Sequence, residues 1–194
     1  MVLVIDTSSA MSAVAVIDGA GAVIAESVAP SGPTYDIDAR VRQLVEPRLV
    51  TRVAVATGPG SFTGLRVGAS YAVGLALGLR LPLHRLRSLE LAAARATEPA
   101  TGVTEAGRGR VYYLVPGGEP SLGEPHDIPT QFRATGWLRE KTVQALTASG
   151  IEMIPDAELR TLGEAAARLL GEAPEVGYDG LGLEYVQSFG PLAG

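Results

Sequence analysis

The sequence predicts an α/β protein of two lobes, each with a mixed sheet that carries helices on its faces. Three observations lead to this prediction. Three short apolar runs follow one another near the start, helix and strand patterns then alternate, and a weaker copy of the opening begins near residue 103. We therefore place a first lobe at 1–98 and a second at 99–194, with a tail from about 179 that can return to the first lobe.

The first lobe opens with three predicted antiparallel strands. Residues 2–5 form an apolar run, and runs at 13–17 and 22–27 flank Asp18-Gly19-Ala20-Gly21, which favours a hairpin. The first run ends at four short polar residues that favour a turn: Asp6, Thr7, Ser8 and Ser9.

A helix, a strand and a second helix follow. Residues 35–49 place apolar side chains at helical spacing, and the β-branched run 52–56 predicts the fourth strand. Ser61 is placed to cap an apolar helix at 61–79. Three meandering strands followed by crossover helices are typical of a ribonuclease-H-like lobe.

The second half is less regular. Residues 103–107 and 111–115 repeat the opening hairpin, with Glu105 in the place of Asp6. Helices are predicted at 141–149 and 158–170 around a short strand at 151–154.

Composition limits the function. The 194 residues include no cysteine and two histidines, which excludes thiol catalysis and cysteine-based metal sites. Sixteen basic against 21 acidic residues give a net charge of −5, so tight direct binding to nucleic acid is not expected. The chain has no signal-peptide pattern, and Arg66 interrupts its most apolar window, so we expect a soluble cytoplasmic protein without a membrane span.

The glycine-rich turn at 58–66, between the fourth strand and the apolar helix, resembles a phosphate-binding loop only in part. A Walker A loop needs Gly-Lys-Ser/Thr at its end, whereas Leu65 follows Gly64, and the dinucleotide fingerprint needs a glycine where Thr63 stands. The residues favour a structural turn over an anion site, and both remain open. The turn residues are Gly58, Pro59, Gly60, Ser61, Thr63, Gly64 and Arg66.

The helix after the turn has almost no polar face, so it should be covered on several sides. Gly64 and Gly68, and again Gly74 and Gly78, lie one helical turn apart, which allows close approach of another backbone. We hypothesise that the helix packs on its own sheet and on a second protein. The alternative is a helix fully covered within the monomer.

Other candidate residues carry no clear chemistry. Asp6 follows the first strand, as an acid does in actin-like kinases, but Ser8 stands where those enzymes have a glycine against the phosphates. Asp6 is equally readable as a turn residue or a magnesium ligand. Neither His84 nor His126 has an acid at ligand spacing, and packing explains Trp137 more simply than base stacking does.

The run from Gly58 to Arg66, Gly-Pro-Gly-Ser-Phe-Thr-Gly-Leu-Arg, resembles the signature of the TsaB family. Residues 3–9, 81–83 and 88–90 support the resemblance, which covers about the first ninety residues. Beyond them it is thinner. Glu105 and Gly107 stand where the family has Asp and Arg, and 183–186 is faintly similar to the family's closing strand.

The resemblance implies an actin-like ATPase (ASKHA) fold with a decayed nucleotide site at residues 6–9. It also implies a non-catalytic scaffold for TsaD, which transfers threonylcarbamoyl to adenosine 37 of tRNAs that read codons beginning with A. No catalytic residue, metal or cofactor is expected in the chain by itself, and ATP or ADP with Mg only in the assembled complex. The ATPase TsaE joins that complex, tRNA binds only through it, and the isolated chain can form homodimers.

In the family, the helices corresponding to 35–49 and 61–79 contact TsaD. The implied interface residues are Val41, Leu44, Val45, Leu65, Gly68, Tyr71, Ala72, Leu75 and Leu79. One departure is that the family's first helix is longer and begins with a His-Ser pair, which is absent here. Competing hypotheses are an ATP-dependent kinase of the same fold, a homodimeric interaction module outside tRNA modification and, last, a peptidase, for which no nucleophile–base pair is present.

Overall fold

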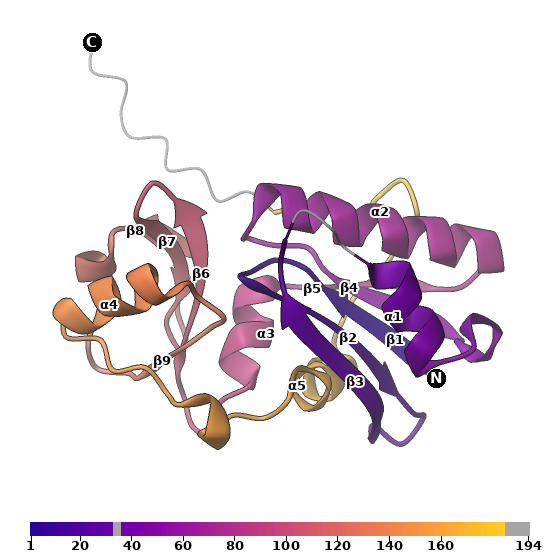
Figure 1. The fold of residues 1–194 in the computed structure, drawn as a ribbon, viewed down its shortest axis with the longest axis horizontal. Coiled ribbons are helices and arrows are strands. Elements are labelled where there is room, and N and C mark those ends of the chain that lie inside the picture. The colour runs from indigo at the N-terminus through magenta and orange to yellow at the C-terminus, as the bar shows by residue number, and fades with distance from the viewer. Residues whose placement is uncertain (33–35, 185–194) are drawn as a thin grey trace, which may run out of the picture.

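The chain forms two mixed sheets, one in each lobe, with helices on their faces (Figure 1). The computed structural model describes residues 1–32 and 36–184. Its two lobes of mixed sheet and helices confirm the α/β class that the sequence predicts.

The first sheet has the strand order β10-β5-β4-β1-β2-β3. Strands β1 to β3 are antiparallel neighbours, β4 and β5 run parallel to β1, and β10 is antiparallel to β5. The bounds are β1 Val2–Asp6, β2 Met11–Ile17, β3 Val23–Pro30, β4 Arg52–Ala56, β5 Leu83–Leu86 and β10 Glu175–Val176. The predicted opening of three antiparallel strands is therefore confirmed.

Both faces of this sheet are buried. Along β1, Leu3 and Ile5 point into the core beneath α1 and α2, while Val2 and Val4 point into the core beneath α3 and α5. Because successive side chains of a strand alternate between faces, a continuous apolar run is what a strand covered on both sides requires.

Among the described residues, four helices cover the first sheet. In Figure 1, α2 lies above the sheet with α1 on the same side, and α3 and α5 lie below. Their bounds are α1 Ile37–Leu44, α2 Phe62–Leu79, α3 Ser88–Ala94 and α5 Leu162–Leu169. The α3 helix also packs against β6, where Gly102 leaves no room for a side chain beside the carbonyl oxygen of Leu89. It thereby joins the two sheets.

The second lobe is smaller. Its sheet has the order β8-β7-β6-β9, with β6 and β9 parallel and the other neighbours antiparallel. Its core includes Val103, Val111 and Leu146. The bounds are β6 Thr101–Gly107, β7 Arg110–Leu114, β8 Ser121–Gly123, β9 Ala134–Thr135 and α4 Glu140–Ala148, and the short 3₁₀ turns of the chain are Pro47–Leu49, Pro125–Asp127 and Asp156–Glu158.

Three predicted elements differ from the structure. The helix predicted at 35–49 ends at Leu44, because Pro47 holds the preceding chain extended and Val45 already has strand-like angles, and Tyr35 lies outside the described residues. The strand predicted at 151–154 is an isolated bridge from Met153 to β9. The helix predicted at 158–170 starts later, where Thr161 caps α5.

The chain returns to the first lobe earlier than expected. We predicted a return from about 179, but α5 already packs on β2 and β3, and β10 pairs with the edge of β5. At its end, the backbone N–H of Glu184 donates to the carbonyl of Thr57 beside the glycine-rich turn. Residues 162–184 therefore belong to the first lobe, while Tyr185 and Val186 lie outside the described residues.

Candidate functional site

The loop after β1 (residues 7–10) faces inward. Asp6 is 4% exposed, and its Oδ1 accepts from the backbone N–H of Ser8 at 2.8 Å. Burial raises the pKa of the Asp6 carboxyl, and the hydrogen bonds from Ser8 and the charge of Arg95 oppose this effect. The cavity that Asp6 lines holds about 10 Å³, about enough for one water molecule. A phosphate group with its magnesium ion cannot enter it.

The glycine-rich turn is a junction of four segments. The N–H of Ser61 donates to the carbonyl of Ser8 at 2.7 Å, and the N–H of Gly58 donates to Oγ of Ser88 at 3.0 Å. The hydroxyl of Thr104, from the second lobe, donates to the carbonyl of Pro59 at 3.0 Å. A Cβ on Gly58, at φ +113°, would lie 2.6 Å from the carbonyl oxygen of Glu184. Neighbouring chain segments therefore surround much of the turn.

The buried side of α2 rests on the same loop. Ser61 caps the helix by accepting from the N–H of Gly64 at 3.2 Å. The hydroxyl of Thr7 donates to the carbonyl of Gly64 at 2.6 Å, and a Cβ on Gly68 would lie 2.3 Å from that hydroxyl oxygen. The first glycine pair therefore admits the chain's own loop and not a second protein.

The opposite side of α2, which we call its outer face, is open. A Cβ on Gly74 or Gly78 would meet nothing within 4 Å. Phe62 is 54% and Leu77 57% exposed, and the guanidinium of Arg66 lies 3.7 Å from the centre of the Phe62 ring. The outer face consists of the exposed residues Phe62, Arg66, Ser70, Gly74, Leu77 and Gly78.

The implied interface residues fall into two groups. Five are buried in the first lobe, which corrects the expectation that they reach a partner: Val41, Val45, Leu65, Gly68 and Ala72. Their apolar character serves the lobe's own core. Leu79 is exposed, whereas Leu44, Tyr71 and Leu75 are partly buried. The Tyr71 hydroxyl donates to Asp38 on α1 at 3.3 Å, and Asp38 also pairs with Arg42 at 2.9 Å.

Two larger cavities lie between the lobes. One, of about 630 Å³, is lined by Ser8, Ser9, Thr63, Glu105 and Arg139 among others. Asp6 does not line it. Glu105 accepts from the N–H of Arg139 at 2.9 Å and from the hydroxyl of Thr142 at 2.6 Å, so the start of α4 occupies its Oε1.

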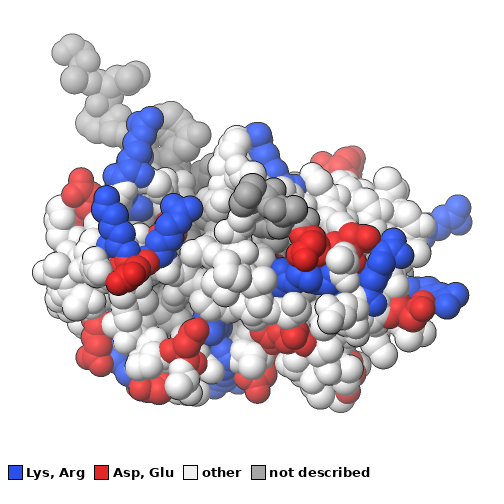
Figure 2. Space-filling view, in the orientation of Figure 1, with Lys and Arg blue, Asp and Glu red and all other residues white. Residues whose placement is uncertain are grey.

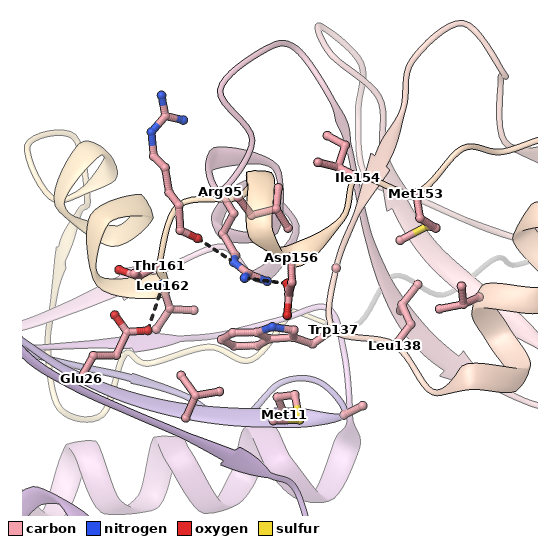
Figure 3. Close-up of a pocket in the computed structure, with 16 residues that line it drawn as sticks. Met11, Glu26, Arg95, Trp137, Leu138, Met153, Ile154, Asp156, Thr161 and Leu162 are labelled. Carbon is pink, nitrogen blue, oxygen red and sulfur yellow. Dashed lines mark hydrogen bonds and ion pairs between the residues drawn. The ribbon is translucent and has the colours of Figure 1, made fainter.

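The other cavity, of about 600 Å³, lies on the α5 side (Figure 3). Arg95, 6% exposed, lies over the ring of Trp137 at 4.4 Å and pairs with Asp156 at 2.9 Å. Glu26 accepts from the first backbone N–H groups of α5, at Leu162 and Gly163. Sequence reasoning missed Arg95 and interpreted Trp137 only as a packing residue, because residues of three separated segments meet here only in the fold.

The described residues offer no metal cluster and one helix of membrane-spanning length. Across residues 1–32 and 36–184, no group of three or more His, Asp or Glu side chains is placed to hold a metal ion. The α2 helix is the one described helix that is long and apolar enough to cross a membrane. It is packed on β4 and β1, as the core helix of a soluble domain is.

Comparison with known proteins places the chain in a family. The model described as "TsaD: tRNA N6-adenosine threonylcarbamoyltransferase" matches residues 42–153, more than half of the chain. The chain is 33% identical to an uncharacterized protein of Mycobacterium leprae over 148 residues, which are 66% of the chain and 40% of the relative. Over 123 residues (52% and 33%), it is 35% identical to a tRNA N6-adenosine threonylcarbamoyltransferase of Granulibacter bethesdensis.

A shorter match connects the chain to a protein named for tRNA modification. Over 69 residues (34% of the chain and 30% of the relative), the chain is 38% identical to the tRNA threonylcarbamoyladenosine biosynthesis protein TsaB of Bacillus subtilis. The matches thus span 40% or less of these curated relatives.

Solved structures establish the fold. YeaZ from Pseudomonas aeruginosa superimposes with a TM-score of 0.75 at 19% identity, covering 95% of this chain and 99% of YeaZ. An uncharacterized protein with similarity to peptidase YEAZ from the same organism gives 0.69 at 21% identity, covering 96% and 99%. At these identities the likeness concerns the fold alone.

Proposed function

Because the chain is a TsaB-like (YeaZ-like) member of the family described as TsaD, tRNA N6-adenosine threonylcarbamoyltransferase, we propose that it is a non-catalytic scaffold subunit in the synthesis of threonylcarbamoyladenosine on tRNA. It binds a TsaD-type transferase through the outer face of α2. The TsaE ATPase joins the assembly in the cytoplasm, and tRNA enters through the complex.

The geometry around Asp6 supports a non-catalytic role. An ATPase of this fold needs its first-strand acid beside the phosphates, whereas here the carboxyl is buried and bonded to its own loop. The hydroxyl of Thr7, the next residue, donates to the carbonyl of Gly64 and so holds α2. We therefore expect the isolated chain to bind neither ATP nor ADP with micromolar affinity. Calorimetric titration that showed such binding would instead favour the kinase hypothesis.

The outer face of α2 carries the proposal. A stable monomer normally covers the apolar side of a helix, but Phe62 and Leu77 are more than half exposed, and Leu79 is 40% exposed. Burying the exposed half of a Phe or Leu side chain contributes about 1 kcal/mol each. The open glycines add to this, because a helix without side chains at two successive turns lets a second helix approach closely.

The edge of this face is polar. Tyr71, Asp38 and Arg42 form a hydrogen-bonded group where α1 meets α2. A polar rim around an apolar centre is the usual anatomy of a protein interface. This arrangement fits a partner that covers α2 and touches α1 at its margin.

Capture by an immobilised cognate TsaD-type protein tests the proposal. Gly74→Arg places a long cation on the outer face, where it meets no other part of the chain, so the monomer should stay folded while capture is lost. Ala145→Arg, on the exposed side of α4, is the matched control and should be captured normally. Circular dichroism of both variants verifies folding. Equal capture of both variants would remove the outer face from the interface.

A second readout concerns the pathway. Depletion of this protein should lower the threonylcarbamoyladenosine content of tRNA, and Gly74→Arg should fail to restore it where Ala145→Arg succeeds. Unchanged modification on depletion would favour an interaction module outside tRNA modification. In the absence of the transferase, the same outer face is open to a second copy, so we expect homodimers that Gly74→Arg dissociates in sedimentation experiments.

A further inference from the structure

One end of the second lobe is basic in a chain that is acidic as a whole. Arg108 and Arg110 lie on the turn between β6 and β7, and Arg139 and Lys141 lie at the start of α4; all four are exposed. Figure 2 shows basic side chains gathered over this part of the molecule, at the left. We call these four residues the basic end.

The fold brings the two pairs together. Glu105, two residues before Gly107 on β6, accepts from the N–H of Arg139 at 2.9 Å, and Gly107 pairs across the hairpin with Arg110. Two residues of a strand span about 7 Å, so the hairpin tip lies close to the first turn of α4. No close ion pair ties up the four cations in the part of the chain that the structure describes. Within residues 1–32 and 36–184, Arg108, Arg110 and Lys141 have no ion-pair partner, and Arg139 has only a loose contact of 3.6 Å to Glu105 while 80% exposed.

The hairpin tip presents an exposed arginine between two glycines. Gly107, Arg108 and Gly109 all have positive φ, at 79°, 54° and 79°. A Cβ on either glycine would meet nothing within 4 Å. A charged group can therefore approach the backbone and the Arg108 guanidinium together, and the planar guanidinium matches phosphate oxygens in two-pronged hydrogen bonds.

The surroundings favour a nucleic acid over a protein. Within the described chain, every large apolar side chain that is exposed belongs to the first lobe, at residue 79 or before. A protein interface has an apolar centre, which the basic end lacks, whereas contacts to a phosphate backbone need only cations. The outer face of α2 and the basic end thus have opposite chemistry.

We infer that the basic end binds the phosphate backbone of tRNA when the chain is held in its complex. This inference rests on the proposed function, which brings the chain to a tRNA-modifying enzyme. The net charge of −5 agrees with a contact that is too weak to bind tRNA by itself and contributes only when the transferase also holds the tRNA.

The test compares tRNA binding by the complete complex over a range of salt concentrations. Arg108→Asn together with Arg110→Thr removes two cations, and Asn tolerates the left-handed backbone at 108. We expect the dependence of log affinity on log salt to fall by about 1 per cation, and affinity at low salt to weaken roughly tenfold. Arg168→Glu, an exposed position on α5, changes the net charge by the same amount and should leave both values unchanged.

The possible outcomes separate the two proposals. If the wild-type chain captures the transferase and the complex binds tRNA, but the double variant binds it with the same affinity and salt dependence, the basic end is not a tRNA contact. If the double variant loses capture of the transferase in the absence of tRNA, the basic end binds protein and the inference is wrong. If the wild-type chain captures no transferase, the proposed function fails and the inference with it.

Discussion

The four glycines of α2 allow the same substitution to act with opposite sign. Gly68 and Gly74 both lie inside the helix, where replacing glycine by alanine lowers the unfolded-state entropy and stabilises by about 0.5–1 kcal/mol. At Gly74 nothing opposes this gain, because the new methyl group meets no atom within 4 Å. Gly74→Ala should therefore stabilise the isolated chain by about 0.5–1 kcal/mol.

At Gly68 the packing reverses the sign. The methyl carbon would lie 2.3 Å from the hydroxyl oxygen of Thr7, so Thr7 must move by about 0.7 Å to reach the 3.0 Å minimum. Thr7 is 1% exposed, and its hydroxyl donates to the carbonyl of Gly64. Overpacking costs about 1–3 kcal/mol and loss of that hydrogen bond about 1 kcal/mol. After subtraction of the gain of about 0.5–1 kcal/mol from replacing glycine, Gly68→Ala should still destabilise the chain by about 1–3 kcal/mol.

Urea unfolding of the two variants, followed by circular dichroism, measures both free energies. Capture by the transferase measures a second effect of Gly74→Ala, which should be opposite in direction to its effect on stability. If a partner helix lies along Gly74, the methyl group that stabilises the monomer should weaken capture, because it holds the two backbones apart. A Gly74→Ala chain that is destabilised as much as Gly68→Ala would refute the assignment of the two faces.

Three further predictions concern stability. Ser61→Ala removes the N-cap of α2 and should cost about 1 kcal/mol in urea unfolding, whereas Ser61→Asp should cost little. Burial raises the folded-state pKa of Asp6 above 3.8, so the folded protein favours the protonated carboxyl more than the unfolded chain does. As pH rises from 3.8 through the folded-state pKa, the stability of the wild type should therefore fall relative to that of Asp6→Asn. A difference that does not vary with pH would contradict the burial of this group. Glu26→Ala leaves the first N–H groups of α5 without acceptors and should cost about 1–2 kcal/mol, and Glu26→Gln less, as measured by thermal unfolding.

Most of the first lobe could be predicted because its local signals agree with its packing. The strands β1, β2 and β4 are apolar runs bounded by turn residues, and Ser61 precedes α2 as a cap should. The end of α1 could not be read from periodicity, since Leu44 and Val45 keep helical spacing up to Pro47. Pro47 requires an extended residue before it, so the helix ends at Leu44.

The placement of α5 shows a different limit. Its apolar residues Leu162, Ala165 and Ala166 fit either sheet equally well from the sequence. Only the fold shows that Glu26 of β3 accepts from its first N–H groups, which attaches the helix to the first lobe. A pattern of apolar positions predicts that a face is buried but does not say which surface buries it.

The same limit explains the interface residues. The sequence shows that α2 is apolar on every side but not which side its own lobe covers, so three of the implied contacts, Leu65, Gly68 and Ala72, lie on its buried side. Thr7 supplies the missing information. In a nucleotide-binding protein of this fold the loop after the first strand faces a phosphate, whereas here its side chain and carbonyl are packed against Gly68 and Gly64. Because that loop is committed to holding one side of α2, the side with Gly74, Leu77 and Gly78 stays open, as the proposed partner contact requires. A larger side chain at position 7, or loss of the contact between Thr7 and Gly68, should therefore disturb the outer face only by moving the whole helix. Thr7→Ser keeps the hydroxyl, so the transferase should capture this variant as it captures the wild type.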